Sequence, residues 1–235
     1  MKMHICLRNR TPAAWLLAIK LLVSGSVFAA SGWTELFNGK NLEGWVQQSG
    51  KARYWVEDGS LVGATVANTG NSFLCTTRSF GDFVLELEFM AVKPVNSGIQ
   101  FRSRYFERDT EQEVKGKKRI LPAFRVSGYQ YEIDAPAKGS TGGVYDEATG
   151  RGWLAPIAED NPARHAAKIG EWNKVRIECK GDHIQTWING VKAADFRDSA
   201  VLRGVIALQV HSIGDGVKNK PGAEIRFRHI RLKEL

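Results

Sequence analysis

Cysteine is scarce in this sequence, with three residues in 235. No two of them stand in the CxxC spacing of common cysteine-ligated metal sites, so we expect no such site. Cys75 and Cys179 fall at apolar positions of strand-like segments. The pattern predicts two buried free thiols, and a disulfide between them in an oxidising compartment stays open as the alternative.

Long hydrophobic runs are missing beyond the N-terminal region, so no later segment is long enough to span a bilayer. Residues 1–29 carry basic residues ahead of the apolar run "AAWLLAIKLLVSGSVFAA", which ends in small residues. This order is typical of a secretory signal. We expect cleavage after Ala29, a single domain over residues 30–235, and a periplasmic or secreted protein. A membrane anchor or an intracellular start is the alternative, because Lys20 interrupts the run.

Positive charge is not concentrated in the chain expected after cleavage. The formal net charge of +8 falls to +4 once the four basic residues of the signal are removed. The densest basic run, "KGKKRI" at 115–120, lies in a strongly charged, glycine-containing stretch that we interpret as a solvated loop. The charge pattern therefore predicts no nucleic-acid partner. Once the signal is cleaved, we expect no membrane partner either.

Helical periodicity is also lacking, and most segments alternate between apolar and polar residues. In 173–188, for example, Val175, Ile177 and Cys179 alternate with charged residues before a Gly181-Asp182 turn. Many short strands with regular turns predict an all-β sandwich or jelly roll. The stretches 104–120 and 136–168 read as long loops, and long loops in compact domains are often functional.

Three of the expected strands carry polar residues on one face. Because side chains alternate along a strand, Arg102, Glu132 and His211 would project from the same outer surface if their strands lie in one sheet. That group could supply an acid, a base and an anion-binding cation. Nearby candidates for substrate binding are Gln100, Gln130, Gln209, Tyr145 and Trp153, with Tyr105 as a further aromatic residue at a strand end. The plain alternative is a solvated outer face with no site.

Paired carboxylates suggest glycoside chemistry. Glu132 and Asp134 share one side of a strand, roughly 7 Å apart by strand rise. Jelly-roll glucanases carry a third carboxylate on the same face, where this sequence has Pro136. That departure argues against a conventional retaining glucanase.

Ordered motifs over residues 33–235 resemble the 3-keto-disaccharide hydrolase domain family. They include "ELFNGKNLEGW", "NSGIQFRS", "GYQYEID", "TGGVYDE" with "RGWL", "GEWNKVRIECKGDHIQTWINGVK" and "IRFRHIRLKEL". The resemblance implies a concanavalin A-like jelly roll, with long loops over its concave face. It also implies an oligosaccharide or glycoside substrate, cleaved after its C3 hydroxyl has been oxidised to a ketone.

A 3-keto sugar can be cleaved by elimination, because the ketone acidifies the proton on C2. Such a site needs a base, a group that holds the enolate oxygen and an acid for the leaving oxygen. The hypothesis assigns the base to His211 or Glu132, the enolate to Arg102, and the acid to Asp134 or Tyr145. Gln130 and Gln209 would orient hydroxyl groups. A divalent metal held by Glu132 and His211 stays open as the alternative to Arg102.

A non-catalytic carbohydrate-binding module is the competing interpretation, because the same fold binds glycans through a similar surface. A surface protein without a small ligand is a third. The sequence does not separate these functions, and it leaves the linkage, the aglycone and the oligomeric state open.

Overall fold

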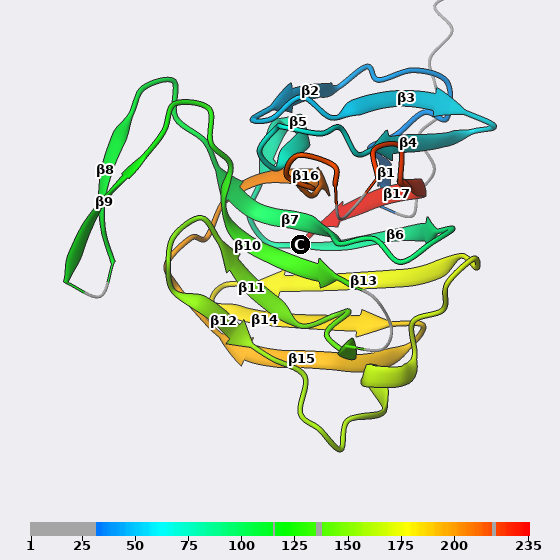
Figure 1. Cartoon of the computed structure of the whole chain (residues 1–235). Helices are drawn as coiled ribbons and strands as arrows, with labels where there is room; N and C mark the ends of the chain where they lie inside the picture. The colour runs from blue at the N-terminus through cyan, green and yellow to red at the C-terminus, as the bar shows by residue number, and fades with distance from the viewer. Residues whose placement is uncertain (1–31, 115, 135–137, 218–219) are drawn as a thin grey trace, which may run out of the picture. The chain divides into compact units, whose positions relative to one another are not determined.

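Strands form where the sequence alternates, and the computed structural model describes residues 32–235 apart from 115, 135–137 and 218–219. The predicted signal, residues 1–29, lies outside the described residues. Among the residues described, no helix is long and apolar enough to cross a membrane. All strand pairs in the two large sheets are antiparallel. The prediction of an all-β jelly-roll sandwich is confirmed (Figure 1).

The first large sheet has eight strands in the order β15-β14-β13-β6-β17-β4-β3, with β1 paired to β17. Its strands are β1 (Thr34–Glu35), β3 (Arg53–Glu57), β4 (Ser60–Ala64), β6 (Phe83–Ala91), β13 (Asn173–Lys180), β14 (His183–Ile188), β15 (Val191–Arg197) and β17 (Glu224–Glu234).

The second large sheet has seven strands in the order β12-β11-β10-β7-β16-β5-β2. Its strands are β2 (Trp45–Gln48), β5 (Ser72–Phe80), β7 (Ser97–Arg104), β10 (Ser127–Ile133), β11 (Val144–Glu147), β12 (Gly152–Ala155) and β16 (Gly204–Val210). The three strands expected to carry polar faces, β7, β10 and β16, are therefore neighbours in one sheet.

The main core lies between the two sheets and takes the apolar half of each alternating pattern. Ile99, Tyr131 and Leu208 of the seven-stranded sheet belong to one buried cluster with Leu85 and Ile177 of the other. Each such side chain contributes about 1.5–3 kcal/mol when fully buried. The polar half of each pattern is left on the outer faces, and this is what positions the candidate site.

Both described cysteines are buried and free, as predicted. Cys179 belongs to the main core, whereas Cys75 belongs to a second apolar cluster with Phe73 and Ala207. The disulfide alternative is therefore wrong, because the two thiols pack in different clusters.

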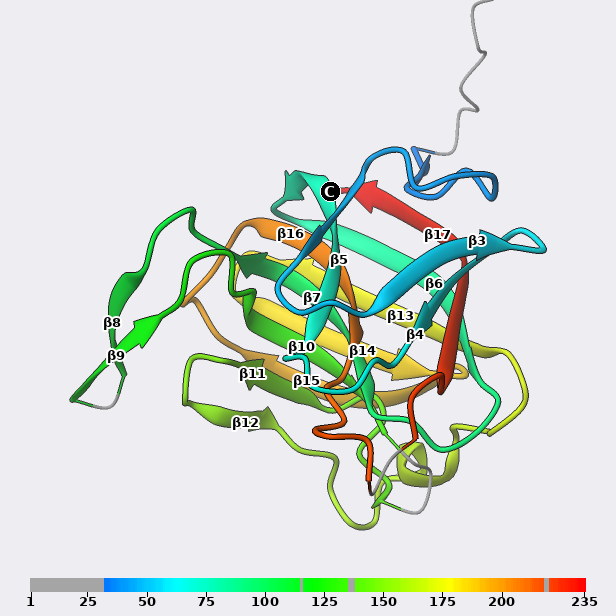
Figure 2. The ribbon, with the colours of Figure 1, turned by 45° about the horizontal axis from the view of Figure 1, so that its top comes forward.

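The two predicted loops contain regular structure instead. Residues 104–120 include β8 (Thr110–Val114), which pairs with β9 (Lys117–Leu121) in a hairpin that reaches away from the two large sheets (Figures 1 and 2). Residues 136–168 include β11, β12 and the 3-10 helix η2 (Pro162–His165). The many charged residues of 104–120 led to the prediction of a loop. In the hairpin such charges pair across the two strands, as Lys118 does with Glu111 at 2.8 Å.

Candidate functional site

The site is built on the outer face of β10, β7 and β16, where the register aligns polar side chains in rows. Glu132 and Gln209 both pair with Gly98, from opposite sides. A Cβ on Gly98 would lie 2.6 Å from Cδ of Gln130, so the side chain of Gln130 occupies the space that glycine leaves. This close approach explains why the middle of the row carries no side chain of its own.

Gln130 is the hub of a buried amide network. Its Oε1 accepts hydrogen bonds from Gln100 Nε2 at 2.6 Å and from Gln209 Nε2 at 2.9 Å. Its Nε2 donates to Glu132 Oε2 at 2.8 Å. Ser103 Oγ donates to Gln100 Oε1 at 2.8 Å and so fixes the orientation of the first amide in this series of hydrogen bonds. Because every amide has its direction set by a neighbour, the network presents an N–H donor to Glu132.

Glu132 is a buried carboxyl with a strongly raised pKa. Its side chain also accepts a hydrogen bond from Asn96 Nδ2 at 2.9 Å, and the residue is 7% exposed. Burial raises the pKa of Glu132 from 4.5 to about 7, and the negative charges of Asp134 and Glu147 add to the rise; the two amide donors oppose it. Glu132 can therefore gain or lose a proton near neutral pH, as a general acid or base requires.

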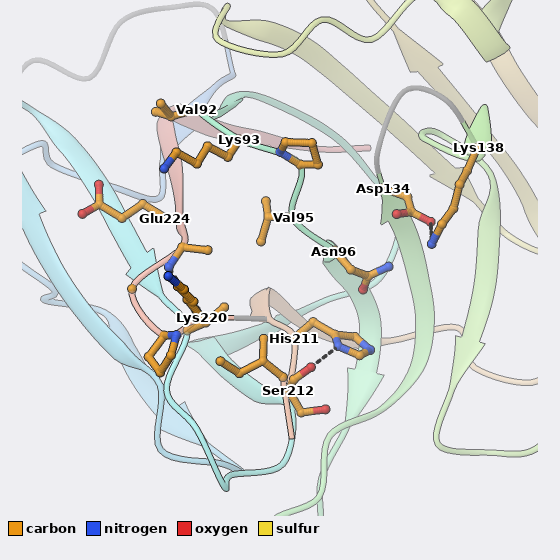
Figure 3. A pocket seen from close by; sticks show the side chains of 16 residues that line it. Val92, Lys93, Val95, Asn96, Asp134, Lys138, His211, Ser212, Lys220 and Glu224 are labelled. Atoms are coloured by element: carbon orange, nitrogen blue, oxygen red, sulfur yellow. Dashed lines mark hydrogen bonds and ion pairs between the residues drawn. The ribbon is translucent and has the colours of Figure 1, made fainter. Parts of the chain in front are cut away.

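The next row along the three strands consists of Asp134, Asn96 and His211. They directly follow or precede the paired residues Ile133, Ser97 and Val210 on their own chains. The row lines a hollow of about 620 Å³ at the end of the sheet (Figure 3). Glu132 does not line the hollow, but it accepts a hydrogen bond from Asn96, which does.

His211 is held in one tautomer. Its Nδ1 lies 2.7 Å from the carbonyl oxygen of Ser212. A carbonyl only accepts, so Nδ1 carries the hydrogen, and in the neutral ring Nε2 keeps the lone pair. Asp134, on the other side of Asn96, pairs with Lys138 Nζ at 2.9 Å. The row thus offers a base, an amide and a carboxylate–ammonium pair.

Arg102 does not join this face, and the prediction that it does is wrong. It is fully buried, and its guanidinium donates to Gly81 O at 2.8 Å, Gly181 O at 2.6 Å and Asp82 Oδ1 at 2.8 Å. The register of β7 with β16 shifts at this point, and Arg102 has a φ of 45°. Such a bulge reverses the alternation that the sequence showed. Arg102 therefore ties the turn between β5 and β6, which connects the two sheets, to the turn between β13 and β14.

A second arginine, which the sequence did not suggest, is paired with a carboxylate of the same sheet. Arg125 Nη2 forms an ion pair with Glu147 Oε1, which also accepts a hydrogen bond from Asn71 Nδ2 at 3.2 Å. Arg125 lies over the ring of Phe73, 5.5 Å from its centroid. We call Asn71, Arg125 and Glu147 the polar bridge. Glu147 could have been predicted from the sequence, because it is two residues from Tyr145 in "VYDE" and so lies on the same face of the strand. No comparable pattern in the sequence points to Arg125.

Tyr145 and Trp153 are paired in register on β11 and β12, and not in loops as expected. Their rings meet edge to face with centroids 5.5 Å apart, and Trp153 is 45% exposed. Tyr145 also pairs with Gln130, so this aromatic pair borders the polar rows. Tyr105 instead packs against the second apolar cluster.

The residues around Glu132 do not fit a metal ion. Among the described residues, no group of three or more His, Cys, Asp and Glu side chains is placed to hold one. The neighbours that reach the two carboxylate oxygens of Glu132 are amide N–H donors, which suit an anion rather than a cation's ligand shell.

A hollow of about 760 Å³ lies on the outer face of the eight-stranded sheet. Glu86 in this hollow is already paired, with Arg176 at 2.9 Å and with Arg231 at 2.7 Å. Arg176 and Lys192 both approach the ring of Trp187, at 5.5 and 5.3 Å. This face is therefore less suited to a ligand than the row at His211.

One sheet of the sandwich thus carries a polar row with an adjoining aromatic pair. This chain belongs to the 3-keto-alpha-glucoside-1,2-lyase-like domain family, whose model matches residues 32–233. The membership confirms the resemblance drawn from the motifs. No curated protein matches the sequence significantly.

Solved structures show the same fold at low identity. A provisionally assigned glycosyl hydrolase from Parabacteroides distasonis has a TM-score of 0.56 at 20% identity, over 88% of this chain and 95% of that one. The carbohydrate-binding module CBM66 from Bacillus subtilis has a TM-score of 0.53 at 19% identity, over 81% and 96%. A galectin-like protein of unknown function from Bacillus subtilis has 0.58 at 14% identity, over 86% and 98%. At these identities the likeness concerns the fold alone.

Proposed function

We propose that this protein cleaves 3-keto-glucosides by elimination in the hollow at His211. One observation carries the proposal: a buried carboxyl with a pKa of about 7, Glu132, lies directly behind the row that contains the Nε2 lone pair of His211. An acid whose pKa lies near the working pH and a base with an available lone pair are what the reaction needs. The family to which the chain belongs supplies the substrate class.

In the proposed first step, His211 Nε2 takes the proton from C2, and the C2–H electrons form the enolate of the C3 ketone. The enolate then re-forms the ketone, a C1–C2 double bond appears, and the C1–O bond breaks. Protonated Glu132, which does not itself line the hollow, gives its proton to the leaving oxygen through one water molecule. Water then adds across the double bond: its oxygen bonds to C1, its proton goes back to Glu132 by the same path, and His211 returns its proton to C2, which yields the 3-keto sugar.

Lys138 takes the part that the sequence assigned to Arg102. Its ammonium lines the hollow and pairs with Asp134, so a positive charge is present where the enolate oxygen forms. Asp134 then positions Lys138 rather than acting as the acid. Gln100, Gln130 and Gln209 act through Glu132, since their amide network fixes its carboxyl.

Turnover of 3-keto-trehalose and a 3-keto-α-glucoside by the purified chain tests the proposal. Release of the alcohol is followed by chromatography, and the unsaturated keto sugar by its ultraviolet absorbance. We expect His211→Asn and Glu132→Gln each to lower kcat by about 10²–10⁴-fold. The matched control is His165→Asn at the end of η2, which should retain full activity. A folded wild type without turnover, or variants as active as the control, would remove the enzyme interpretation.

Binding without cleavage is the second candidate function, and the exposure of Trp153 favours it. An exposed indole beside Tyr145 offers a surface on which a sugar ring can stack. This candidate expects unoxidised glucosides to bind, Trp153→Ala to abolish that binding, and His211→Asn to leave it unchanged. Calorimetric titration of both variants with the same glucoside separates the two functions.

A periplasmic or secreted location is part of the proposal and is supported by the composition of residues 1–29. Expression of the full chain with a C-terminal tag should give a product that begins at Ala30 in the periplasm or medium. N-terminal sequencing of a full-length product in the cytoplasm would contradict it.

A further inference from the structure

The hollow at His211 changes character from one end to the other. Asn96, Asp134 and His211 stand together on one side of it, opposite Val92, Lys93 and Glu224 (Figure 3). Beyond the polar row, the lining combines charged side chains with six aliphatic ones: Val92, Pro94, Val95, Ile213, Pro221 and Ala223. An apolar group placed against these aliphatic side chains would lose water to carbon surface.

The aliphatic wall is held in place by the strand that it adjoins. Thr65, next to β4, accepts a hydrogen bond from Gly222 N at 2.9 Å through its carbonyl oxygen. Its backbone N donates to Ala223 O, and its Oγ1 accepts from Ala223 N, both at 3.0 Å. Three hydrogen bonds to one residue fix this side of the hollow before any ligand arrives, so the shape is preformed.

The outer end also carries unbalanced positive charge. Lys93 and Lys220 line it and take part in none of the ion pairs between described residues. The one acidic residue there, Glu224, already contacts Arg226 Nη2 at 3.0 Å. An anionic group placed among the aliphatic side chains would therefore meet two ammonium groups that have no other partner in the described part of the chain.

We infer that the outer end of this hollow binds the leaving group of the substrate, and that this group is an apolar ring or chain bearing an acidic group. The inference rests on the proposed function, because it places C1 of the keto sugar at the polar row and the leaving oxygen between the two ends. A disaccharide would fit this end less well than an acidic aryl glucoside. The hollow of about 620 Å³ has room for a sugar and such an aglycone together.

The test compares kcat/KM for the 3-keto forms of trehalose, phenyl α-glucoside and 4-carboxyphenyl α-glucoside. We expect both aryl substrates to have a lower KM than the disaccharide. A Lys93→Met, Lys220→Met double variant should raise KM for the carboxyphenyl substrate by about fivefold and leave the phenyl substrate unchanged, since two exposed charge contacts are lost. Lys180→Met is the matched control, because Lys180 is an exposed lysine at the end of β13. Val92→Asn should raise KM for both aryl substrates and leave KM for the 3-keto form of trehalose unchanged.

The outcomes separate this inference from the proposed function. A preference for the carboxyphenyl substrate over the phenyl substrate that disappears only in the double variant supports the assignment. Because the same two substrates are compared in every variant, the difference in their leaving-group chemistry does not account for such a loss. Equal KM values for all three substrates, or a double variant that behaves like Lys180→Met, overturn the inference and leave the cleavage reaction standing. Failure of the folded wild type to turn over any of the three overturns the proposed function and this assignment with it.

Discussion

Asn71 and Glu147 meet across the outer face of the seven-stranded sheet. Asn71 directly precedes β5 and Glu147 ends β11, and β10, β7 and β16 separate these strands in the sheet. Their 3.2 Å hydrogen bond, continued by Arg125, therefore passes over the three central strands. The side chains of the glutamine network on the central strands are almost fully buried. Asn71 also accepts from Ser212 N at 2.9 Å, which links the bridge to the segment of His211.

Opening the polar bridge should cost stability. Glu147→Gln leaves Arg125 without its carboxylate, and the side chains of the pair are only 26% and 9% exposed. We expect the free energy of unfolding to fall by about 1–3 kcal/mol in urea titrations. Glu111→Gln is the control, because its pair with Lys118 is 55% and 71% exposed and should contribute under about 1 kcal/mol. Equal losses in both variants would mean that the bridge is an ordinary surface contact.

The same substitution should lower the pKa of Glu132. The negative charge of Glu147 is one of the causes that raise it. With that charge removed, the limb of the kcat profile that reports Glu132 should move to lower pH. A profile that stays in place while stability falls would show that the two carboxyls are uncoupled.

Gly98 should not tolerate a side chain. A methyl group there would lie 2.6 Å from Cδ of Gln130, and Gln130 is held by three amide hydrogen bonds. Gly98→Ala should lower the free energy of unfolding by about 1–3 kcal/mol and lower kcat more than binding, because it moves the donor that faces Glu132. Gly81→Ala is the control: the nearest atom to its Cβ would be 3.6 Å away. A Gly98→Ala protein with unchanged kcat would disconnect the network from catalysis.

Much of this architecture was predictable from periodicity, and the failures have local causes. The alternation in "GYQYEID" and "VIALQVH" placed Glu132, Gln130, Gln209 and His211 on one face, since nothing in those strands interrupts the period. The prediction for Arg102 was wrong because one bulged residue in β7 reverses the faces of the strand. The sequence "SGIQFRSR" has no glycine or proline at that point that would indicate a bulge. The polar bridge joins residues 22 and 76 positions apart, beyond what a pattern within one strand can show.

Arg102 should matter to stability and not to chemistry. Replacing it with Met removes the hydrogen bonds that its buried guanidinium donates to Gly81 O, Gly181 O and Asp82. We expect a loss of about 3 kcal/mol in the free energy of unfolding, and a kcat within about twofold of wild type at temperatures where the variant is folded. Arg78→Met, from an exposed pair with Glu234, controls for loss of charge. Loss of kcat in a fully folded Arg102→Met protein would return this residue to the catalytic group.

Glu132 should make the protein less stable as the pH rises. Its pKa is 4.5 when exposed and about 7 in the fold, so between these values the folded state binds more protons than the unfolded state. Stability therefore falls as the pH rises through this window, by about 3 kcal/mol at most, and stays low above pH 7. Urea titrations at pH 5 and pH 8 measure the difference.

Glu132→Gln isolates this contribution, because glutamine keeps the shape and cannot titrate. The variant should therefore show a flatter dependence of stability on pH between pH 5 and 8 than the wild type. The kcat of the wild type should follow the same ionisation, since only protonated Glu132 can supply the leaving oxygen, and activity should fall above pH 7. Equal pH slopes for wild type and variant would show that Glu132 is ionised throughout this range, and the acid of the proposed reaction would then have to be sought elsewhere in the row.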